Sequence, residues 1–447
     1  MTLPQDELSP PLEEQKNENK METKEDKTTI FPHQLLVLMF LITGLFTTAS
    51  FIANAFMGLY AVIIGATASA LSLITSLRNL IQLAVQSTFG RISDKIGRKL
   101  LIFLGLLGSG IFVALFPLIK NGWLLVGAVS LYSIGVASYV PAFTALQGDI
   151  SNKENRAGLI SLITIVGALA SMVGLVAVGF ASNLGDSEWL QYTIILEIAA
   201  GIFIIGSFVS LLVTDPPVER ITKRQKFTLK PVIKNKSFRK FVIINSLMGF
   251  SMSLGWPIFP FVRGEYATAQ QNTWIWAIFA FFQIVSILIT RPFINKISRK
   301  KLLIFGRIIM FYVPLNLALT VLFFPYWWHL AICNMTSGLS VALYMVGQNS
   351  YILDCAPEKE KGTFTGIHNF FMGIATFLGS LIMGIIADIL IIRFDKWPSI
   401  VVLLFVITGA RLISALGFFF LQKPAIQVEK TEVAIEPPPE VTLGGTK

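Results

Sequence analysis

Long runs of apolar residues constrain the fold of this 447-residue chain more than any other feature of its sequence. A helix needs roughly 20 such residues to cross a hydrocarbon core about 30 Å thick. Only 14% of the residues are charged, whereas soluble domains carry about 25%. We therefore predict an all-α, polytopic membrane protein with twelve transmembrane helices. The twelve runs cover approximately residues 35–59, 66–89, 100–119, 123–147, 157–181, 190–213, 241–262, 273–293, 302–324, 330–353, 364–392 and 400–421.

A long polar connection divides these runs into six and six. It spans Thr214–Lys240 and is rich in proline, lysine and arginine. Such a basic segment is attracted to anionic lipid headgroups of the inner leaflet. We therefore expect a disordered cytoplasmic tail, a six-helix bundle, a basic cytoplasmic linker, a second six-helix bundle and a second disordered cytoplasmic tail. Their expected ranges are 1–30, 31–213, 214–240, 241–421 and 422–447.

The two halves are related by an internal repeat. Residues 94–99 (Asp-Lys-Ile-Gly-Arg-Lys) correspond to residues 295–300 (Asn-Lys-Ile-Ser-Arg-Lys), and at the same offset Gln82 falls on Gln283. Farther along the chain, Tyr139 corresponds to Tyr344, and the segment 149–156 corresponds to 354–361. Four features in the same order indicate duplication. Two pseudo-symmetric six-helix bundles are therefore expected.

Lysine and arginine are concentrated on one side of the predicted membrane. One set of loops holds only Lys120, Arg263, Arg393 and Lys396, while the other set and the linker hold far more cations. Because cation-rich loops stay in the cytoplasm, we expect both termini to be cytoplasmic and the protein to lie in the cell membrane. The net charge of +10 comes from these loops, so we expect contact with membrane lipids and no nucleic-acid partner.

One ten-residue segment, between the second and third runs, combines two glycines, one acid and four cations. It resembles the cytoplasmic loop motif of the major facilitator superfamily, Gly-x-x-x-Asp-(Arg/Lys)-x-Gly-(Arg/Lys)-(Arg/Lys), and lies between the same two helices. The resemblance covers nearly the whole apolar body and implies the family's two-bundle fold and rocker-switch alternating access. The matching residues are Gly90, Asp94, Lys95, Gly97, Arg98 and Lys99.

The resemblance also implies a conformational gate. Asp94 is expected to contact the start of helix 11, and Arg98 to contact Asp149 at the end of helix 4. The alternative for Asp149 is to pair with Arg156 in its own loop. The second half is expected to carry a weaker gate, because Asn295 replaces the acid. Its other candidate gate residues are Arg299, Asp354 and Lys361.

Polar residues inside the apolar runs indicate where a cavity lies, because such groups are costly in hydrocarbon and usually face the bundle interior. Arg78 lies roughly 18 Å from the surface at 1.5 Å per residue, so we expect it to bind substrate or to hold helices together. We expect Arg411 to be structural and Arg307 to snorkel to the surface. The candidate cavity residues are Asn54, Arg78, Gln82, Tyr139, Trp256, Gln283, Tyr344 and Gln348.

Three ionisable residues within the runs are candidates for proton coupling: Glu197, His368 and Asp388. The motifs of proton-coupled drug antiporters of this superfamily are incomplete here. Where their fourth helix reads Arg-x-x-Gln-Gly, residues 131–135 read Leu-Tyr-Ser-Ile-Gly, and the proline of their fifth-helix motif is missing. This departure weakens the case for exchange of drugs against protons.

We therefore predict a secondary active transporter of small organic molecules. Efflux of amphiphilic compounds is favoured by the aromatic content, which includes 36 Phe and 8 Trp. The alternatives are transport of a small organic anion bound by Arg78, and a non-transporting membrane receptor or scaffold. We expect no enzyme activity, no catalytic residue, no metal site and no cofactor, since no nucleophile–base pair or metal-ligand spacing occurs. The expected partners are a small-molecule substrate and a coupling proton, and the expected state is a monomer.

Overall fold

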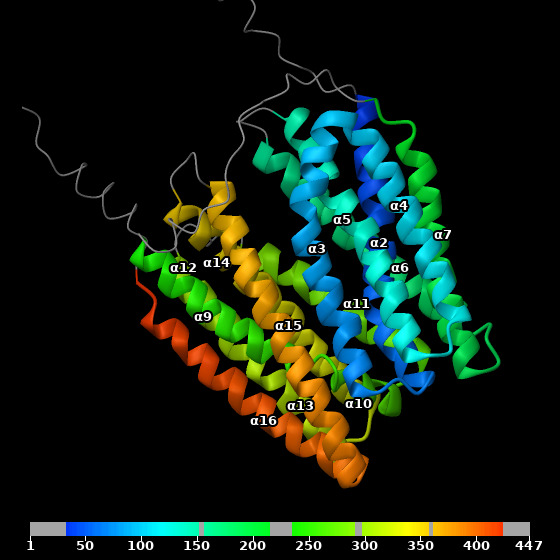
Figure 1. Cartoon of the computed structure of the whole chain (residues 1–447), viewed down its shortest axis with the longest axis vertical. Helices are drawn as coiled ribbons and strands as arrows, with labels where there is room; N and C mark the ends of the chain where they lie inside the picture. The colour runs from blue at the N-terminus through cyan, green and yellow to red at the C-terminus, as the bar shows by residue number, and fades with distance from the viewer. Residues whose placement is uncertain (1–32, 152–155, 215–234, 291–296, 357–360, 423–447) are drawn as a thin grey trace, which may run out of the picture.

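The computed structural model describes residues 33–151, 156–214, 235–290, 297–356 and 361–422 as two groups of helices (Figure 1). The N-terminal group comprises α2 (His33–Ile63), α3 (Ala68–Ile96), α4 (Arg98–Leu115), α5 (Gly122–Asp149), α6 (Arg156–Ser182) and α7 (Glu188–Ser210). The C-terminal group comprises α9 (Lys236–Ser253), α10 (Phe259–Tyr266), α11 (Ala269–Thr290), α12 (Arg299–Ile308), α13 (Tyr312–Leu322), α14 (Trp327–Cys355), α15 (Lys361–Arg393) and α16 (Lys396–Leu416). The predicted all-α fold is confirmed.

Polar caps set where several helices begin. Asn121 Oδ1 accepts hydrogen bonds from the amides of Trp123 and Leu124 at the start of α5, 2.9 and 3.2 Å away. Thr67 caps α3 in the same way. These side chains satisfy amide groups that have no partner within the first helical turn. Between α3 and α4 the chain turns at Gly97 alone, whose φ of 100° favours glycine.

Eleven helices in the described residues are long and apolar enough to cross a membrane. The remaining predicted run, 241–262, falls on α9 and α10, which are separated by a turn at residues 254–258. Pro257 in this turn has no amide hydrogen and so cannot continue the helix. The run is therefore a broken helix, and with it the chain has the twelve helices that were predicted. The two predicted tails and most of the linker lie outside the described residues.

A second break interrupts the run 302–324. It consists of α12, a short 3₁₀ turn (η3, Ile309–Phe311) and α13. Pro314 follows the turn and has no amide hydrogen to give to the carbonyl of Met310, four residues earlier. A carbonyl without a partner is costly inside a membrane. The two breaks therefore leave backbone groups that other side chains must satisfy.

The two groups of helices touch at one end. We call the end that carries residues 90–99 the motif side and the opposite end the far side. The main contacts between the groups are those of α3 with α15 and of α6 with α11. On the far side, Ser380 Oγ donates to Ser72 O at 3.2 Å, and Gly384 of α15 lies directly against Ser72. Figure 1 shows the groups converging toward the far side and diverging toward the motif side.

The glycine at this contact gives a test of the packing. A Cβ atom at residue 384 would lie 2.7 Å from Ser72 Cβ and 2.8 Å from Ala68 O. Gly384→Ala should therefore lower the melting temperature in detergent, since overpacking costs about 1–3 kcal/mol. Gly366→Ala on the same helix is the matched control, because nothing lies within 4 Å of its added Cβ. That control should be neutral or stabilising, and an equal effect of both substitutions would contradict the packing.

Candidate substrate cavity

A cavity of about 460 Å³ lies between the two groups of helices. One wall comes from α2 and α3, and the other comes from the broken α9–α10 segment, α11, α14 and α16. Much of the lining is aromatic or sulfur-containing: Phe51, Met57, Met252, Trp256, Phe259, Trp276, Phe279 and Met310. Such a surface accepts an apolar body with little specificity for its shape.

Arg78 reaches this cavity from α3. Its Nη1 donates to Asn54 Oδ1 at 2.7 Å, and its Nε and Nη2 lie 3.4 and 3.3 Å from Asn79 Oδ1. Both partners are neutral amides, which orient the guanidinium but do not balance its charge. Arg78 and Asn54 were both predicted to line the cavity, and the structure places them there in contact with each other.

Arg263 lines the cavity although it was not among the predicted cavity residues. It was assigned to an external loop, but it lies within α10 and lines the cavity. Its guanidinium carbon is 4.4 Å from the centre of the Trp276 ring, and Nη2 donates to Asn334 Oδ1 at 3.1 Å. Its Nε is buried and has no hydrogen-bond partner. The sequence offered one signal: Arg263 directly follows the last residue of the apolar run 241–262, so the same helix could include it.

Arg411 of α16 also lines the cavity, but its contacts are those of a structural residue. Its Nη1 donates to Met310 O at 3.2 Å and its Nη2 to Met252 O at 2.8 Å. These carbonyls lie at the two helix breaks, and the Met310 carbonyl is the one that Pro314 leaves without an amide donor. A cation is favourable at such carbonyl-rich helix ends. This arrangement agrees with the structural role expected for Arg411.

The cavity carries positive charge and no acid. None of its lining residues in the described chain is Asp, Glu or His. The ion pairs recorded between described residues, Arg98–Asp149 and Arg299–Asp354, leave Arg78, Arg263 and Arg411 without a carboxylate within 4.0 Å. In a low-dielectric interior, unbalanced cations favour an anionic ligand.

The other predicted cavity residues occupy several places. Trp256 lines the cavity, and Gln283 lines a smaller neighbouring space of about 260 Å³ that also touches Asn54. Tyr139 is buried between Phe46 and Phe143, with ring centres 3.8 and 5.2 Å away. Gln82 is half-buried on α3 and does not line either space. Tyr344 and Gln348 belong to a separate polar cluster.

That cluster surrounds Arg307, which is only 1% exposed, so the expectation that it snorkels to the surface was wrong. Its Nη2 donates to Asn245 Oδ1 at 2.9 Å and to Gln348 Oε1 at 3.1 Å. The guanidinium also lies 3.7 Å from the Tyr344 ring centre. Partners on neighbouring helices hold Arg307 inside, and the distance along its own helix could not reveal them.

His368 joins the same cluster. Because Asn245 Oδ1 faces the arginine, its Nδ2 donates to His368 Nε2 at 2.7 Å. The ring proton is then on Nδ1, which donates to Asn369 Oδ1 at 3.1 Å. In this conformation His368 is therefore a neutral imidazole with both nitrogens satisfied, and it lies outside the cavity lining.

The two acidic candidates for proton coupling also lie outside the cavity lining. Glu197 is exposed on the surface of α7. Asp388 of α15 instead joins the two groups of helices on the far side: its Oδ1 accepts from the Ala68 amide at 2.7 Å and its Oδ2 from the Ser69 amide at 2.9 Å. A carboxylate at a helix N-terminus is favoured by the exposed amide groups and the helix dipole. Asp388 therefore strengthens the far-side contact.

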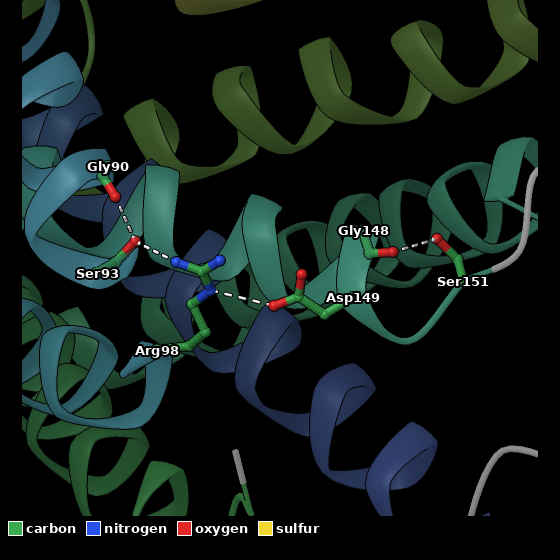
Figure 2. A network of polar contacts seen from close by, with 6 residues as sticks. All are labelled: Gly90, Ser93, Arg98, Gly148, Asp149 and Ser151. Carbon is green, nitrogen blue, oxygen red and sulfur yellow. Dashed lines mark hydrogen bonds and ion pairs between the residues drawn. The ribbon is translucent and has the colours of Figure 1, made fainter. Parts of the chain in front are cut away.

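On the motif side, equivalent positions of the two halves form equivalent ion pairs, one in each half. Arg98 Nε lies 3.1 Å from Asp149 Oδ2, and Arg98 Nη1 donates to Ser93 Oγ at 2.8 Å (Figure 2). In the second half, Arg299 Nε lies 3.5 Å from Asp354 Oδ2 at the corresponding positions. Each pair joins two helices of the same half, α4 with α5 and α12 with α14.

The remaining candidate gate residues are only partly described. Gly90 accepts a hydrogen bond from Ser93 Oγ at 2.7 Å, as Figure 2 shows, and Lys95 is exposed. Asp94, Arg156 and Lys361 lie in helices whose side chains at these positions are not described, and Asn295 lies outside the described residues. The expected contact of Asp94 with helix 11 therefore stays a prediction.

The Asp388 contact predicts a change in the far-side equilibrium. Asp388→Asn offers one oxygen to two amide donors, so the far side should open more often. Spin labels are placed at the exposed residues Leu118 and Ile392 in a cysteine-free background. Double electron–electron resonance should then show a distribution of label-to-label distances shifted to longer values. The control is Asp395→Asn at the same end, because Asp395 makes no capping hydrogen bond. Unchanged distances in the Asp388 variant would refute this role.

Comparison with known proteins agrees with this architecture. The family model described as Major Facilitator Superfamily matches residues 39–249 and 241–442. The multidrug resistance protein MdtH of Proteus mirabilis (strain HI4320) is 27% identical over 217 residues, which are 46% of this chain and 51% of that protein. The chain thus spans about half the length of this curated relative.

Solved structures share the fold at low sequence identity. A mutant of the nucleoside transporter NupG has a TM-score of 0.73 and 14% identity, covering 87% of this chain and 100% of its own. A bacterial homologue of the human lysosomal transporter Spinster, in an inward-facing and occupied conformation, has a TM-score of 0.68 and 12% identity, covering 90% and 98%. The chain belongs to the Major Facilitator Superfamily, and its helices are those of a multi-pass membrane protein.

Proposed function

We propose that this transporter carries an organic anion with an apolar body, by rocker-switch alternating access. The observation that carries the proposal is the charge of the central cavity: Arg78, Arg263 and Arg411 line it, and no acidic residue does. The aromatic and methionine lining supplies the surface for the apolar body. Of the two substrate classes predicted from the sequence, the cavity thus favours the anion over a general amphiphile.

Efflux of amphiphilic compounds is the second candidate. It is supported by the apolar lining and by the similarity to MdtH, whose name states multidrug resistance. Against it stands the cost of placing a lipophilic cation, a common amphiphilic drug, beside guanidinium groups that no acid balances. A transporter for neutral or anionic amphiphiles would combine both candidates. A receptor or scaffold has no comparable support.

Alternating access requires a contact that holds each end state. We propose that the far-side contact around Asp388 holds the state described here, and that the residues 90–99 hold the opposite state. The ion pairs Arg98–Asp149 and Arg299–Asp354 keep the helix ends of each half in place while the halves move. We also propose that the motif side is cytoplasmic, with both termini, because it carries most of the lysine and arginine.

Coupling to protons, if it drives transport, should act away from the substrate. No titratable acid or histidine lines the cavity in the described chain. Asp388 is the candidate with the clearest mechanism, because a proton on its carboxylate would remove one of the two acceptors for the α3 amides. We therefore propose that a proton would change the far-side contact and leave the affinity of the cavity unchanged.

Arg78 gives the direct test of the substrate class. In proteoliposomes, Arg78→Gln should abolish uptake of organic anions, and Arg78→Lys should reduce it roughly 10- to 100-fold, because lysine keeps the charge but loses the forked geometry. Lys120→Gln, which removes an exposed cation outside the cavity, is the control and should transport normally. Anion uptake at the wild-type rate by a folded Arg78→Gln protein would refute the proposal, and so would a wild-type protein that transports cations and neutral compounds but no anion.

A further inference from the structure

The three guanidinium groups of the cavity differ in how far the protein itself satisfies them. Arg411 gives both terminal nitrogens to backbone carbonyls at the helix breaks, 2.8 and 3.2 Å away. Among the described residues, Arg78 and Arg263 have only side-chain amides as oxygen partners, Asn54 and Asn79 for the first and Asn334 for the second. Arg78 and Arg263 are therefore the two cavity guanidinium groups that are not held by backbone carbonyls at a helix break and so are the better placed to bind a ligand.

The surroundings of Arg263 include further donors without partners. Its own Nε is buried and makes no hydrogen bond, and the same is true of Nε1 of Trp276, on whose ring the guanidinium rests. Both residues line the cavity. Buried donors without an acceptor are costly, so a wall that holds two of them is suited to an acceptor-rich group such as a carboxylate or phosphate.

The two ligand-dependent arginines belong to opposite halves of the transporter. Arg78 lies on α3 and Arg263 on α10, on facing walls of the same cavity. When the halves close around the substrate, water leaves, and both positive charges then need compensation in a low-dielectric space. A ligand with a single negative charge would leave one arginine unbalanced, whereas a ligand with two would balance both.

We propose that the substrate is an organic dianion whose two anionic groups bind Arg78 and Arg263, with its apolar body against the aromatic lining. This inference rests on the proposed function and makes it narrower. It assigns Arg263 as the anion-binding residue of the C-terminal half. It assigns Asn334 and Trp276 as the residues that position its guanidinium.

The test compares each dianion with a matched monoanion. The probes are adipate, suberate and sebacate, whose flexible chains reach different spans, and the half-amide of each. Binding to the purified full-length protein is measured by titration calorimetry. The dianion of best-fitting length should bind at least tenfold more tightly than its half-amide. In Arg263→Gln this ratio should fall to about one, because the second anionic group has lost its partner.

Two further variants keep the result interpretable. Arg393→Gln removes an exposed guanidinium at the far side and should leave the ratio unchanged. Arg263→Lys keeps the charge and covers the case in which Arg263→Gln fails to fold; its ratio should be intermediate. Equal binding of dianion and half-amide to the wild-type protein, a ratio that survives Arg263→Gln, or no binding by any dicarboxylate would overturn the inference.

The outcomes also separate this inference from the proposed function. If half-amides bind as tightly as dianions and Arg78→Gln abolishes both, the transporter carries monoanions and only the present inference fails. If no anion of the series binds while amines with the same chains do, the proposed function fails as well.

Discussion

Positive charge inside a membrane has to be balanced or solvated, and this constraint organises the centre of the protein. Four arginines of the described chain, Arg78, Arg263, Arg307 and Arg411, lie in its interior or line its cavity, and they meet the constraint in three ways. Arg411 binds the carbonyls at two helix breaks. Arg307 is held by two side-chain amides and an aromatic ring. Arg78 and Arg263 are left facing a cavity. The breaks at Pro257 and Pro314, which look like defects in two helices, thus supply acceptors for one of these charges.

Contacts within each half differ in kind from contacts between the halves. Ion pairs at equivalent positions, Arg98–Asp149 and Arg299–Asp354, tie helices together within each half. Between the halves, the far-side contact uses a carboxylate on amide groups, a serine hydroxyl and closely packed glycines. In the proposed rocker-switch cycle, contacts within a half persist, whereas contacts between the halves break on the side that opens.

The sequence predicted the features that depend on periodicity and on pattern. The apolar runs identified the twelve helices, the repeat identified the two halves, and three-to-four spacing placed Asn54 and Arg78 toward the interior. Features that depend on neighbouring helices were not accessible. Arg263 was assigned to a loop because it follows the last residue of an apolar run. Arg307 was expected at the surface because its partners, Asn245 and Gln348, come from helices distant in sequence. Asp388 could be recognised as an acid in a membrane, but its contact with α3 depends on how the two halves pack.

The preference of the cavity for negative charge is the central proposal, and a direct binding comparison tests it. Phenylbutyrate and phenylbutylamine have the same apolar body and opposite charge at neutral pH. Equilibrium dialysis of each against the purified wild-type transporter measures the preference without any assumption about coupling or direction of transport. We predict that the carboxylate binds at least tenfold more tightly than the amine. Equal binding, or tighter binding of the amine, would contradict it.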